Sequence, residues 1–339
     1  LLSDHIGGQN VMRVYFSALT GSPYSQVSQF SFISTTLPTL APIYGLSGFP
    51  FAAFDTPLRA PGVRLTYDGR FLYLTSMTNA SDVESHGVHV YKRDAGLNFA
   101  LVESLFSPDV RGAGLWGINI ATDRNATSAR VAISDEAPNR TSSCGNCAAV
   151  YVYQRVTPLD DGSHTFLDLI EAPAGAASST SRFGRSMALS NNILVVGARN
   201  TAEADGSVGA GRCYIYRDTF RNGTYTLLQV LSATAIYGPL LGSPLPSGLG
   251  FCASVSINEA ATRIAIGNSG ISATNTFYGQ VGGVLMYEFN STLDRFVYTG
   301  GLIREDNVEA ATPPHTVAMD FYEGPLLSPQ SQTYEHVFA

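Results

Sequence analysis

A strand-like segment that ends in tyrosine returns five times along this chain of 339 residues. The copies are "QNVMRVY" to Tyr15, "GVHVY" to Tyr91, "AAVYVY" to Tyr153, "GRCYIY" to Tyr216 and "GGVLMY" to Tyr287. Each is followed by an aromatic residue that opens another such segment: Tyr24, Phe99, Phe166, Tyr225 and Phe296. Short alternating apolar runs bounded by Gly, Pro, Asn and Asp indicate strands. Their return every 62 to 76 residues indicates a repeat architecture.

A second pair of strands precedes four of these segments, beginning at Gly62, Trp116, Phe183 and Phe251. The unit therefore has four antiparallel strands in about 60–70 residues, the size expected for one sheet of a stacked array. One such sheet cannot cover both its faces, so copies must stack, and radial stacking gives a β-propeller. We predict an all-β fold with blades at residues 45–105, 108–172, 176–233 and 247–303.

The two ends carry complementary parts of a further unit. Residues 1–35 supply a third and a fourth strand, and residues 312–339, with a weak copy from His315, supply a first and a second. We predict that residues 9–33 lie beside residues 315–338 in one composite blade, so that residues 1–339 form a single propeller. The start lacks Met, so we expect an excerpt of a longer chain. Pairing between chains instead would build a polymer.

The segment "FGRSMALSNNILVVGA" followed by "GRCYIY" resembles an FG-GAP repeat, the blade of the integrin α-subunit head. Phe183-Gly184 and Gly197-Ala198 match the pattern, with Arg199 where proline would stand, and Trp116-Gly117 is a conservative variant of the opening. The resemblance implies an extracellular propeller. We expect the aromatic residue to fill the wedge between blades and the glycine to permit close backbone approach.

Integrin-type blades often bind calcium in the turn between their first two strands, through a D-x-D-x-D-G-x-x-D loop. The corresponding turns here contain Asp68, Asp123, Asn191 and Asn258, and none offers the six or more oxygens that calcium prefers. The resemblance is therefore to the short-turn variant, and we expect no metal and no cofactor.

The other motifs in the sequence are explained by structure and do not predict a binding or catalytic site. Gly112 to Gly117 satisfies G-x-G-x-x-G, but the strand-like "INIATD" follows where a dinucleotide site needs a helix. Asp160-Asp161-Gly162 reads as a solvated turn. The six histidines show no metal-ligand spacing, and no G-x-S-x-G elbow is present. We therefore expect that the chain is not an enzyme.

The four cysteines fall into two pairs. Cys144 and Cys147 lack the βαβ context of a redox motif and the second pair of a zinc site, so a disulfide within the loop is expected. Cys213 lies on a predicted third strand and Cys252 on the first strand of the next unit. They either form a bridge across a blade interface or stay as two buried thiols.

Five sequons fit N-x-S/T without proline, and all fall in predicted turns or loops. They are Asn79, Asn125, Asn139, Asn222 and Asn290. Charged residues make up only 14% of the chain, against about 25% in an average domain. Bulky, solubilising glycans at these sites would offset that deficit. The net charge of −7 argues against nucleic acid as a partner, and no apolar run is long enough for a membrane helix.

We therefore predict an extracellular, N-glycosylated structural or adhesion module, such as a building block of an extracellular fibre or matrix. Its partners would be other extracellular proteins or copies of itself. An alternative is a recognition head that binds a protein or carbohydrate on one face of the ring. A third hypothesis is a secreted hydrolase with its site at the axis.

Overall fold

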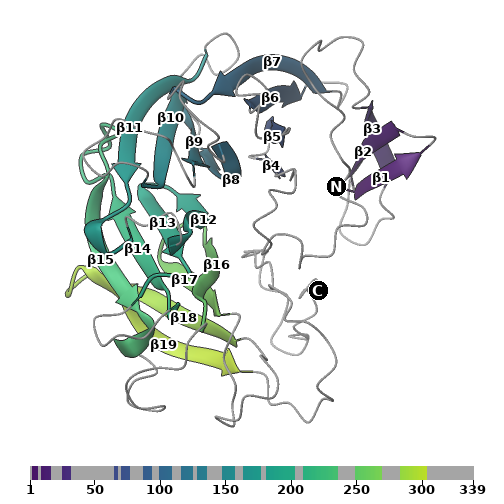
Figure 1. The fold of residues 1–339 in the computed structure, drawn as a ribbon. Helices are drawn as coiled ribbons and strands as arrows, with labels where there is room; N and C mark the ends of the chain where they lie inside the picture. Colours follow the sequence, from purple (N-terminus) through teal and green to yellow (C-terminus); the bar gives the residue numbers. More distant parts are fainter. Residues whose placement is uncertain are drawn as a thin grey trace, which may run out of the picture.

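The computed structural model describes most of the chain between residues 65 and 303, and the strands near the N-terminus. The described ranges are 2–6, 9–16, 25–31, 65–67, 70–76, 87–93, 99–108, 116–124, 128–135, 147–156, 163–176, 181–202, 209–235, 249–268 and 283–303. Within them the chain is almost entirely β-strand, arranged in five antiparallel sheets. Figure 1 shows the sheets around a shared centre, with β4, β8, β12 and β16 nearest to it.

Four of the sheets have four strands each, in simple sequence order, and we name them blades 1 to 4. Blade 1 contains β4 (Leu65–Tyr67), β5 (Phe71–Ser76), β6 (Gly87–Arg93) and β7 (Phe99–Phe106). Blade 2 contains β8 (Trp116–Arg124), β9 (Ser128–Asp135), β10 (Ala149–Val156) and β11 (Thr165–Glu171). The short 3-10 helix η3 (Ala174–Ala176) precedes blade 3. Blade 3 contains β12 (Phe183–Ser190), β13 (Ile193–Ala198), β14 (Arg212–Arg217) and β15 (Thr226–Ser232). Blade 4 contains β16 (Phe251–Ile257), β17 (Arg263–Asn268), β18 (Gly283–Asn290) and β19 (Arg295–Ile303). The predicted all-β propeller of four-stranded blades is confirmed.

The N-terminal sheet has one strand more than the sequence analysis predicted. It runs in the order β1 (Leu2–Ile6), β2 (Gln9–Phe16), β3 (Ser25–Ser31), and only β2 and β3 were expected. Ile6 pairs with Gln9, and the sequence between them is Gly7-Gly8. Two glycines between strands are a hairpin signal, so the sequence does contain evidence for the additional strand. Residues 315–338 lie outside the described residues, so their pairing with this sheet stays a prediction.

The recurring tyrosine occupies the same structural position in every sheet. The pairing between the last two strands shifts by one residue directly before the tyrosine, as a β-bulge produces. This shift precedes Tyr15, Tyr91, Tyr153, Tyr216 and Tyr287. The five segments are thus true repeats, and the bulge gives a fixed reference point from which equivalent residues can be counted.

Counting from this bulge corrects one member of the aromatic series. Tyr225 lies two residues before Leu227, the partner of Tyr216, and Phe296 lies two residues before the partner of Tyr287. In blade 2 the partner of the tyrosine is Phe166 itself, so the equivalent of Tyr225 is His164. His164 is buried and Phe166 is exposed. A histidine replaces the expected aromatic residue, and its planar ring fills the same space.

The apolar core lies between the blades rather than within them. One cluster joins blades 1 and 2 and includes Tyr73, Trp116 and Tyr151. A second joins blades 2 and 3, and a third joins blades 3 and 4 around Phe251. Because each blade buries both faces against its neighbours, the second strand of blade 2 is buried along its whole length. This is the stacking that the repeat required.

The Phe-Gly opening of a blade has a backbone reason. Trp116, Phe183 and Phe251 start the first strands of blades 2, 3 and 4, and directly after each of them the pairing with the second strand skips residues. The next residue then adopts a left-handed conformation, with φ of 73° at Gly117, 84° at Gly184 and 64° at Cys252. Glycine adopts this conformation without steric cost, which explains the motif.

The same glycines also contact the preceding blade closely. A Cβ on Gly117 would lie 2.8 Å from Thr75 Cγ2, and one on Gly184 would lie 2.7 Å from Ser134 Cβ. Thr75 and Ser134 are equivalent positions, three residues after the second-strand partner of the tyrosine. Close approach therefore fixes where one blade sits on another.

At the third interface this arrangement is reversed. Cys252 takes the place of the glycine in the left-handed position, and the residue it faces on the preceding blade is Gly197. Gly197 is equivalent to Thr75 and Ser134, and a Cβ there would collide with the carbonyl oxygen of Cys252. One member of the facing pair is a glycine at each of these three interfaces.

We predict that Gly184→Ala destabilises the chain by about 1–3 kcal/mol or more, because it adds left-handed strain to a collision with the Cβ of Ser134. The control is Gly300→Ala in β19, where a Cβ would meet nothing within 4 Å. Denaturant unfolding of both variants measures the difference. Equal midpoints for the two variants would show that the contact does not constrain the blades.

Candidate functional site: the outer strands

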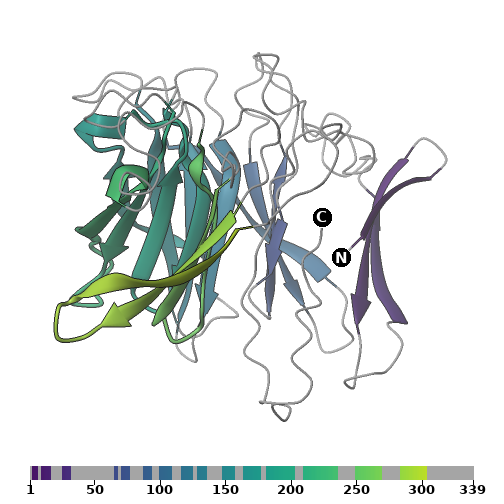
Figure 2. The ribbon, with the colours of Figure 1, turned by 90° about the horizontal axis from the view of Figure 1, so that it is seen from below.

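The fourth strand of each blade forms the outside of the ring. These strands are β7, β11, β15 and β19, and each is the last in the order of its sheet. Figure 2 shows the same arrangement turned by 90°, with β19 on the outside of blade 4. An edge strand presents backbone N–H and C=O groups that its own sheet does not pair, so it is a natural place for another chain to bind.

Large apolar side chains are exposed along these strands at repeated positions. The residue opposite the bulge tyrosine is Leu101, Phe166, Leu227 or Tyr298 in blades 1 to 4. These four side chains are 41%, 53%, 48% and 44% exposed. Further exposed residues on the same strands are Val102, Phe106, Leu169 and Val230. We call these eight residues the outer apolar row.

The outer strands carry few charges to oppose association. Their charged residues are Glu103, Asp168, Glu171 and Arg295. Natural edge strands are commonly protected by charged residues, lysine above all, and these four strands contain no lysine. Only Glu103 and Asp168 lie between exposed apolar residues on these strands, so the protection that charges normally give an edge strand is weak here.

Two of the acids are used between blades. Glu103, Asp168 and Gln229 occupy the same position relative to the bulge. Their side-chain oxygens accept the backbone N–H of the residue just before or at the start of the next outer strand. The acceptor–donor distances are 2.9 Å to His164, 2.7 Å to Tyr225 and 2.8 Å to Phe296. We call this repeated hydrogen bond the inter-blade clamp.

The clamp between blades 1 and 2 is a charged cluster in which Arg155 and His164 are buried and Glu103 is partly buried. Arg155 Nη2 donates to Glu103 Oε2 at 2.8 Å, and His164 Nδ1 donates to the same oxygen at 2.6 Å. Tyr73 Oη lies 3.2 Å from His164 Nε2, and the Arg155 guanidinium lies 4.6 Å from the centre of the Phe71 ring. Burial raises the pKa of Glu103, but the hydrogen bonds from His164 and Arg155 outweigh it, so this pKa lies below its ordinary value.

The clamp between blades 2 and 3 extends into the next hairpin turn. Arg130 Nη2 lies 3.1 Å from Asp218 Oδ2, and Arg130 Nη1 donates to Tyr225 Oη at 3.2 Å. Burial raises the pKa of Tyr225 to about 12. Asp218 also accepts the backbone N–H groups of Asn222 and Gly223, at 3.1 and 2.9 Å. Asp218 therefore fixes the turn that carries a predicted glycosylation site.

The structure places two of the predicted glycosylation sites. Asn222 and Asn290 are exposed at the hairpin turns after β14 and at the end of β18. In both sequons the asparagine Oδ1 accepts the backbone N–H of the threonine two residues on, at 3.0 Å. The other predicted sites lie outside the described residues: Asn79, Asn125 and Asn139.

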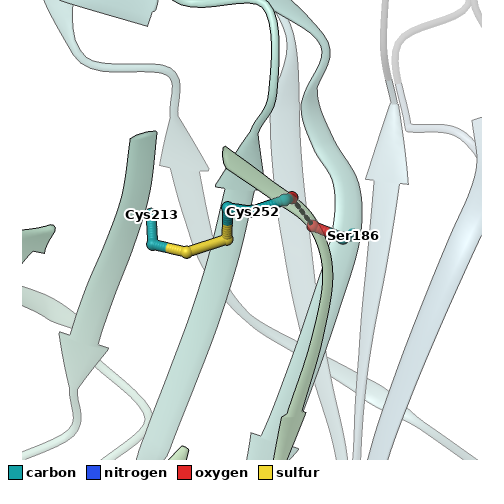
Figure 3. Close-up of a disulfide and its surroundings, with 3 residues drawn as sticks. All are labelled: Ser186, Cys213 and Cys252. Atoms are coloured by element: carbon teal, nitrogen blue, oxygen red, sulfur yellow. Dashed lines mark hydrogen bonds between the residues drawn. A yellow bond between two sulfur atoms is a disulfide. The ribbon is translucent and has the colours of Figure 1, made fainter. Parts of the chain in front are cut away.

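A disulfide joins Cys213 on β14 to Cys252 on β16, and so connects blades 3 and 4 (Figure 3). The two Cα atoms are 5.6 Å apart, and both side chains are buried. Gly197 pairs with Cys213 and leaves room for the sulfur of Cys252. Ser186 Oγ donates to the Cys252 carbonyl oxygen at 2.6 Å. Cys147 is buried and also disulfide-bonded, while Cys144 lies outside the described residues.

The remaining predicted positions show structural roles where they are described. Asn258 Oδ1 accepts the backbone N–H groups of Thr262 and Arg263, at 2.8 and 2.7 Å, and so closes its own turn. Burial raises the pKa of Asp123. Gly117 is followed by a strand, as predicted. Asp68 and residues 160–162 lie outside the described residues. The described ranges contain no group of three or more potential metal-ligating side chains.

No helix in the described part of the chain is both long and apolar enough to cross a membrane.

The charged cluster gives a pH prediction. Because the pKa of Glu103 is lowered by folding, its carboxylate adds stability that is full above the ordinary value of about 4.3 and is lost as the pH falls through the lower folded pKa. We expect Glu103→Gln to lower the free energy of unfolding at pH 7 by about 2–3 kcal/mol and to weaken its acid dependence.

The matched control is Glu288→Gln, which removes an exposed pair with Arg263 at 3.0 Å and should cost less than about 1 kcal/mol. Unfolding curves between pH 3 and 7 test both variants. A Glu103 variant with the wild-type pH profile would show that the cluster does not hold blades 1 and 2 together.

One family and several solved structures are similar to this chain. Residues 173–216 match the family model of the FG-GAP repeat. No curated protein matches the chain. A Pseudomonas aeruginosa periplasmic gluconolactonase is 14% identical with a TM-score of 0.48, covering 86% of this chain and 64% of its own. A Lactobacillus plantarum protein is 13% identical with a TM-score of 0.47, covering 89% of this chain and 67% of its own. This chain thus spans about two thirds of their length.

These comparisons correct one expectation and confirm another. The expectation that the chain is not an enzyme is contradicted, because the solved structures that are similar to the chain include a gluconolactonase. The likeness at this identity extends to the fold alone, so no reaction follows from it. The predicted resemblance to FG-GAP propellers is confirmed by the match that contains Phe183-Gly184 and Gly197-Ala198. The chain is a β-propeller that contains an FG-GAP repeat.

Proposed function

We propose that this chain is an extracellular, N-glycosylated propeller with a structural or adhesion role. It contacts other extracellular proteins or copies of itself through its outer strands. The observation that carries this proposal is the outer apolar row, in which the same position of all four blades holds a large exposed apolar side chain.

The row supports an interaction role on energetic grounds. Single exposed apolar residues are common, but apolar residues gathered on a surface mark places where proteins associate. Here they lie on edge strands whose backbone groups offer pairing to an added strand. The few charges on these strands oppose such pairing weakly, and Glu103 and Asp168 are turned to the inter-blade clamps.

The position of the row favours a building block over the alternative of a recognition head. A head that binds a ligand on one face of the ring would use the loops at the ends of the strands. The outer apolar row instead lies on β7, β11, β15 and β19, the strands on the outside of the ring (Figure 1). A repeated surface suits a repeated partner, and copies of this chain in a fibre or matrix provide one.

Several features support the extracellular assignment. The disulfide between Cys213 and Cys252 is of the kind that persists in oxidising compartments. The FG-GAP match is compatible with an extracellular propeller. Asn222 and Asn290 are exposed at turns, where an oligosaccharide can project into water.

We further propose that residues 1–339 form one propeller. The four blades fall within or close to residues 45–105, 108–172, 176–233 and 247–303. The sheet of β1, β2 and β3 would be completed by residues 315–338, in the same chain or in a neighbouring one. Closure of this kind would remove an edge that could otherwise aggregate.

The double variant Phe166→Glu with Leu227→Glu is expected to weaken self-association at least tenfold while the chain stays folded, as its circular dichroism spectrum should show. Both side chains are about half exposed, and the Phe166 ring also packs against Tyr151 and Tyr153, so a moderate loss of stability is expected. Two charges in the outer apolar row would have to be desolvated on contact, which opposes association. Analytical ultracentrifugation and electron microscopy of the wild type and the variant measure assembly.

The control for this experiment is Ala260→Glu with Asn200→Glu, which adds the same charge at exposed positions away from the outer strands. Equal association of both double variants would contradict the role of the row. A wild type that remains monomeric while binding a glycan or protein ligand would favour the recognition head.

A second prediction concerns the glycans. We expect at least three of the five sequons to carry sugar in material from a eukaryotic secretory host, among them Asn222 and Asn290. Intact mass before and after enzymatic deglycosylation measures this. An unchanged mass would rule out the glycosylation and remove a main support for the secretory assignment.

A further inference from the structure

Phe220 is the most exposed large apolar residue in the described part of the chain. Its side chain is 84% exposed, at the turn between β14 and β15. It does not belong to the outer apolar row. A single exposed apolar residue needs no explanation in itself. The position of Phe220 is notable, because it lies two residues before the predicted glycosylation site Asn222 in the segment Phe220-Arg221-Asn222-Gly223-Thr224.

The turn that carries both residues is tightly fixed. Asp218 is fully buried, and its carboxylate accepts the backbone N–H groups of Asn222 and Gly223. Gly223 has a φ of 92°, and a Cβ there would lie 2.8 Å from Leu167 Cδ1 of blade 2. Leu167 therefore packs directly under the turn. These contacts support the turn, and with it the backbone of the asparagine, from the buried side.

The asparagine side chain is itself oriented. Asn222 Oδ1 accepts the backbone N–H of Thr224 at 3.0 Å, which directs the amide nitrogen away from that bond. Phe220 and Asn222 are both exposed, and Arg221 between them is in the left-handed region, with a φ of 53°. Two residues of chain span at most about 7 Å, so a sugar on Asn222 lies within reach of a phenyl ring at Phe220.

We propose that Phe220 is a packing platform for the first N-acetylglucosamine of a glycan on Asn222. The pyranose ring of this sugar has an apolar face of C–H groups, which packs favourably on the face of an aromatic ring. The inference rests on the proposed glycosylation of Asn222. It adds Phe220 to that site, and it identifies the group that would cover the exposed Phe220 ring as a glycan of the mature protein.

Blade 4 provides an internal comparison. Asn290 lies at the corresponding turn, and its Oδ1 accepts the backbone N–H groups of Thr292 and Leu293, both at 3.0 Å. The residue two positions before Asn290 is Glu288, which pairs with Arg263. The two sequons share the hydrogen bond from the asparagine Oδ1 to the backbone N–H two residues on, and they differ in the aromatic residue. A glycan on Asn290 lacks the platform.

The test is a double-variant cycle on the full chain, secreted from a eukaryotic host. Thr224→Ala removes the sequon, and the backbone N–H that bonds to Asn222 is kept. Phe220→Ala is made in the wild-type and in the Thr224→Ala backgrounds. We expect Phe220→Ala to lower the melting temperature by about 2 °C when Asn222 is glycosylated and to leave it unchanged when it is not. Glycopeptide mass spectrometry gives the occupancy of Asn222 and Asn290 in every variant.

The outcomes separate the inference from the function on which it rests. Equal effects of Phe220→Ala in the two backgrounds overturn the platform and leave the glycoprotein proposal intact. A wild type with sugar on Asn290 and none on Asn222 also overturns the platform alone. A wild type without sugar at either site overturns both. Occupancy at Asn290 should be the same in all four proteins, since Phe220 does not adjoin that sequon in the chain.

Discussion

The contact between the first strand of one blade and the second strand of the blade before it determines how the propeller is assembled. At this contact the chain leaves its regular pairing, enters the left-handed region and lies against the neighbouring blade. Two side chains cannot both fit there. Gly184 faces Ser134 at one interface, and Cys252 faces Gly197 at another. The glycine can thus change sides while the spacing of the blades is kept.

A second contact joins the blades near the outside of the ring. The inter-blade clamps of Glu103, Asp168 and Gln229 connect each outer strand to the next one. Together the inner and outer contacts hold each blade at two separate places. The outer apolar row is consequently presented on a rigid frame, and a partner that binds it need not first order a flexible surface.

The fold was predictable because its strongest signal is local. Each tyrosine such as Tyr216 ends a short alternating segment, and its neighbours repeat that pattern. The clamp was not predictable, because Glu103, Asp168 and Gln229 differ in charge and size, and only strand register shows that they are equivalent. His164 was missed for a similar reason, since Phe166 nearby offered a more obvious aromatic residue.

The candidate site was harder to predict than the fold. The sequence indicated that Leu101 and Leu227 lie in strands, but an apolar residue in a strand is normally buried, and only the bulge and the neighbouring blade decide which ones face water. Sequons, in contrast, can be recognised from the N-x-S/T pattern alone. Asn222 and Asn290 could be named in advance, whereas the support of the first by Asp218 depends on contacts between residues that no pattern connects.

The disulfide between Cys213 and Cys252 has a mechanical consequence. It spans 39 residues of sequence and crosses from the third strand of blade 3 to the first strand of blade 4. A force that pulls the chain apart from its ends passes through the sulfur atoms and bypasses the enclosed loop. At about 3.4 Å per residue, about 130 Å of chain is withheld from extension. Blades 3 and 4 would therefore resist separation under tension after the non-covalent contacts between blades 1 and 2 had failed, and a stretched module would keep a folded remnant from which to recover.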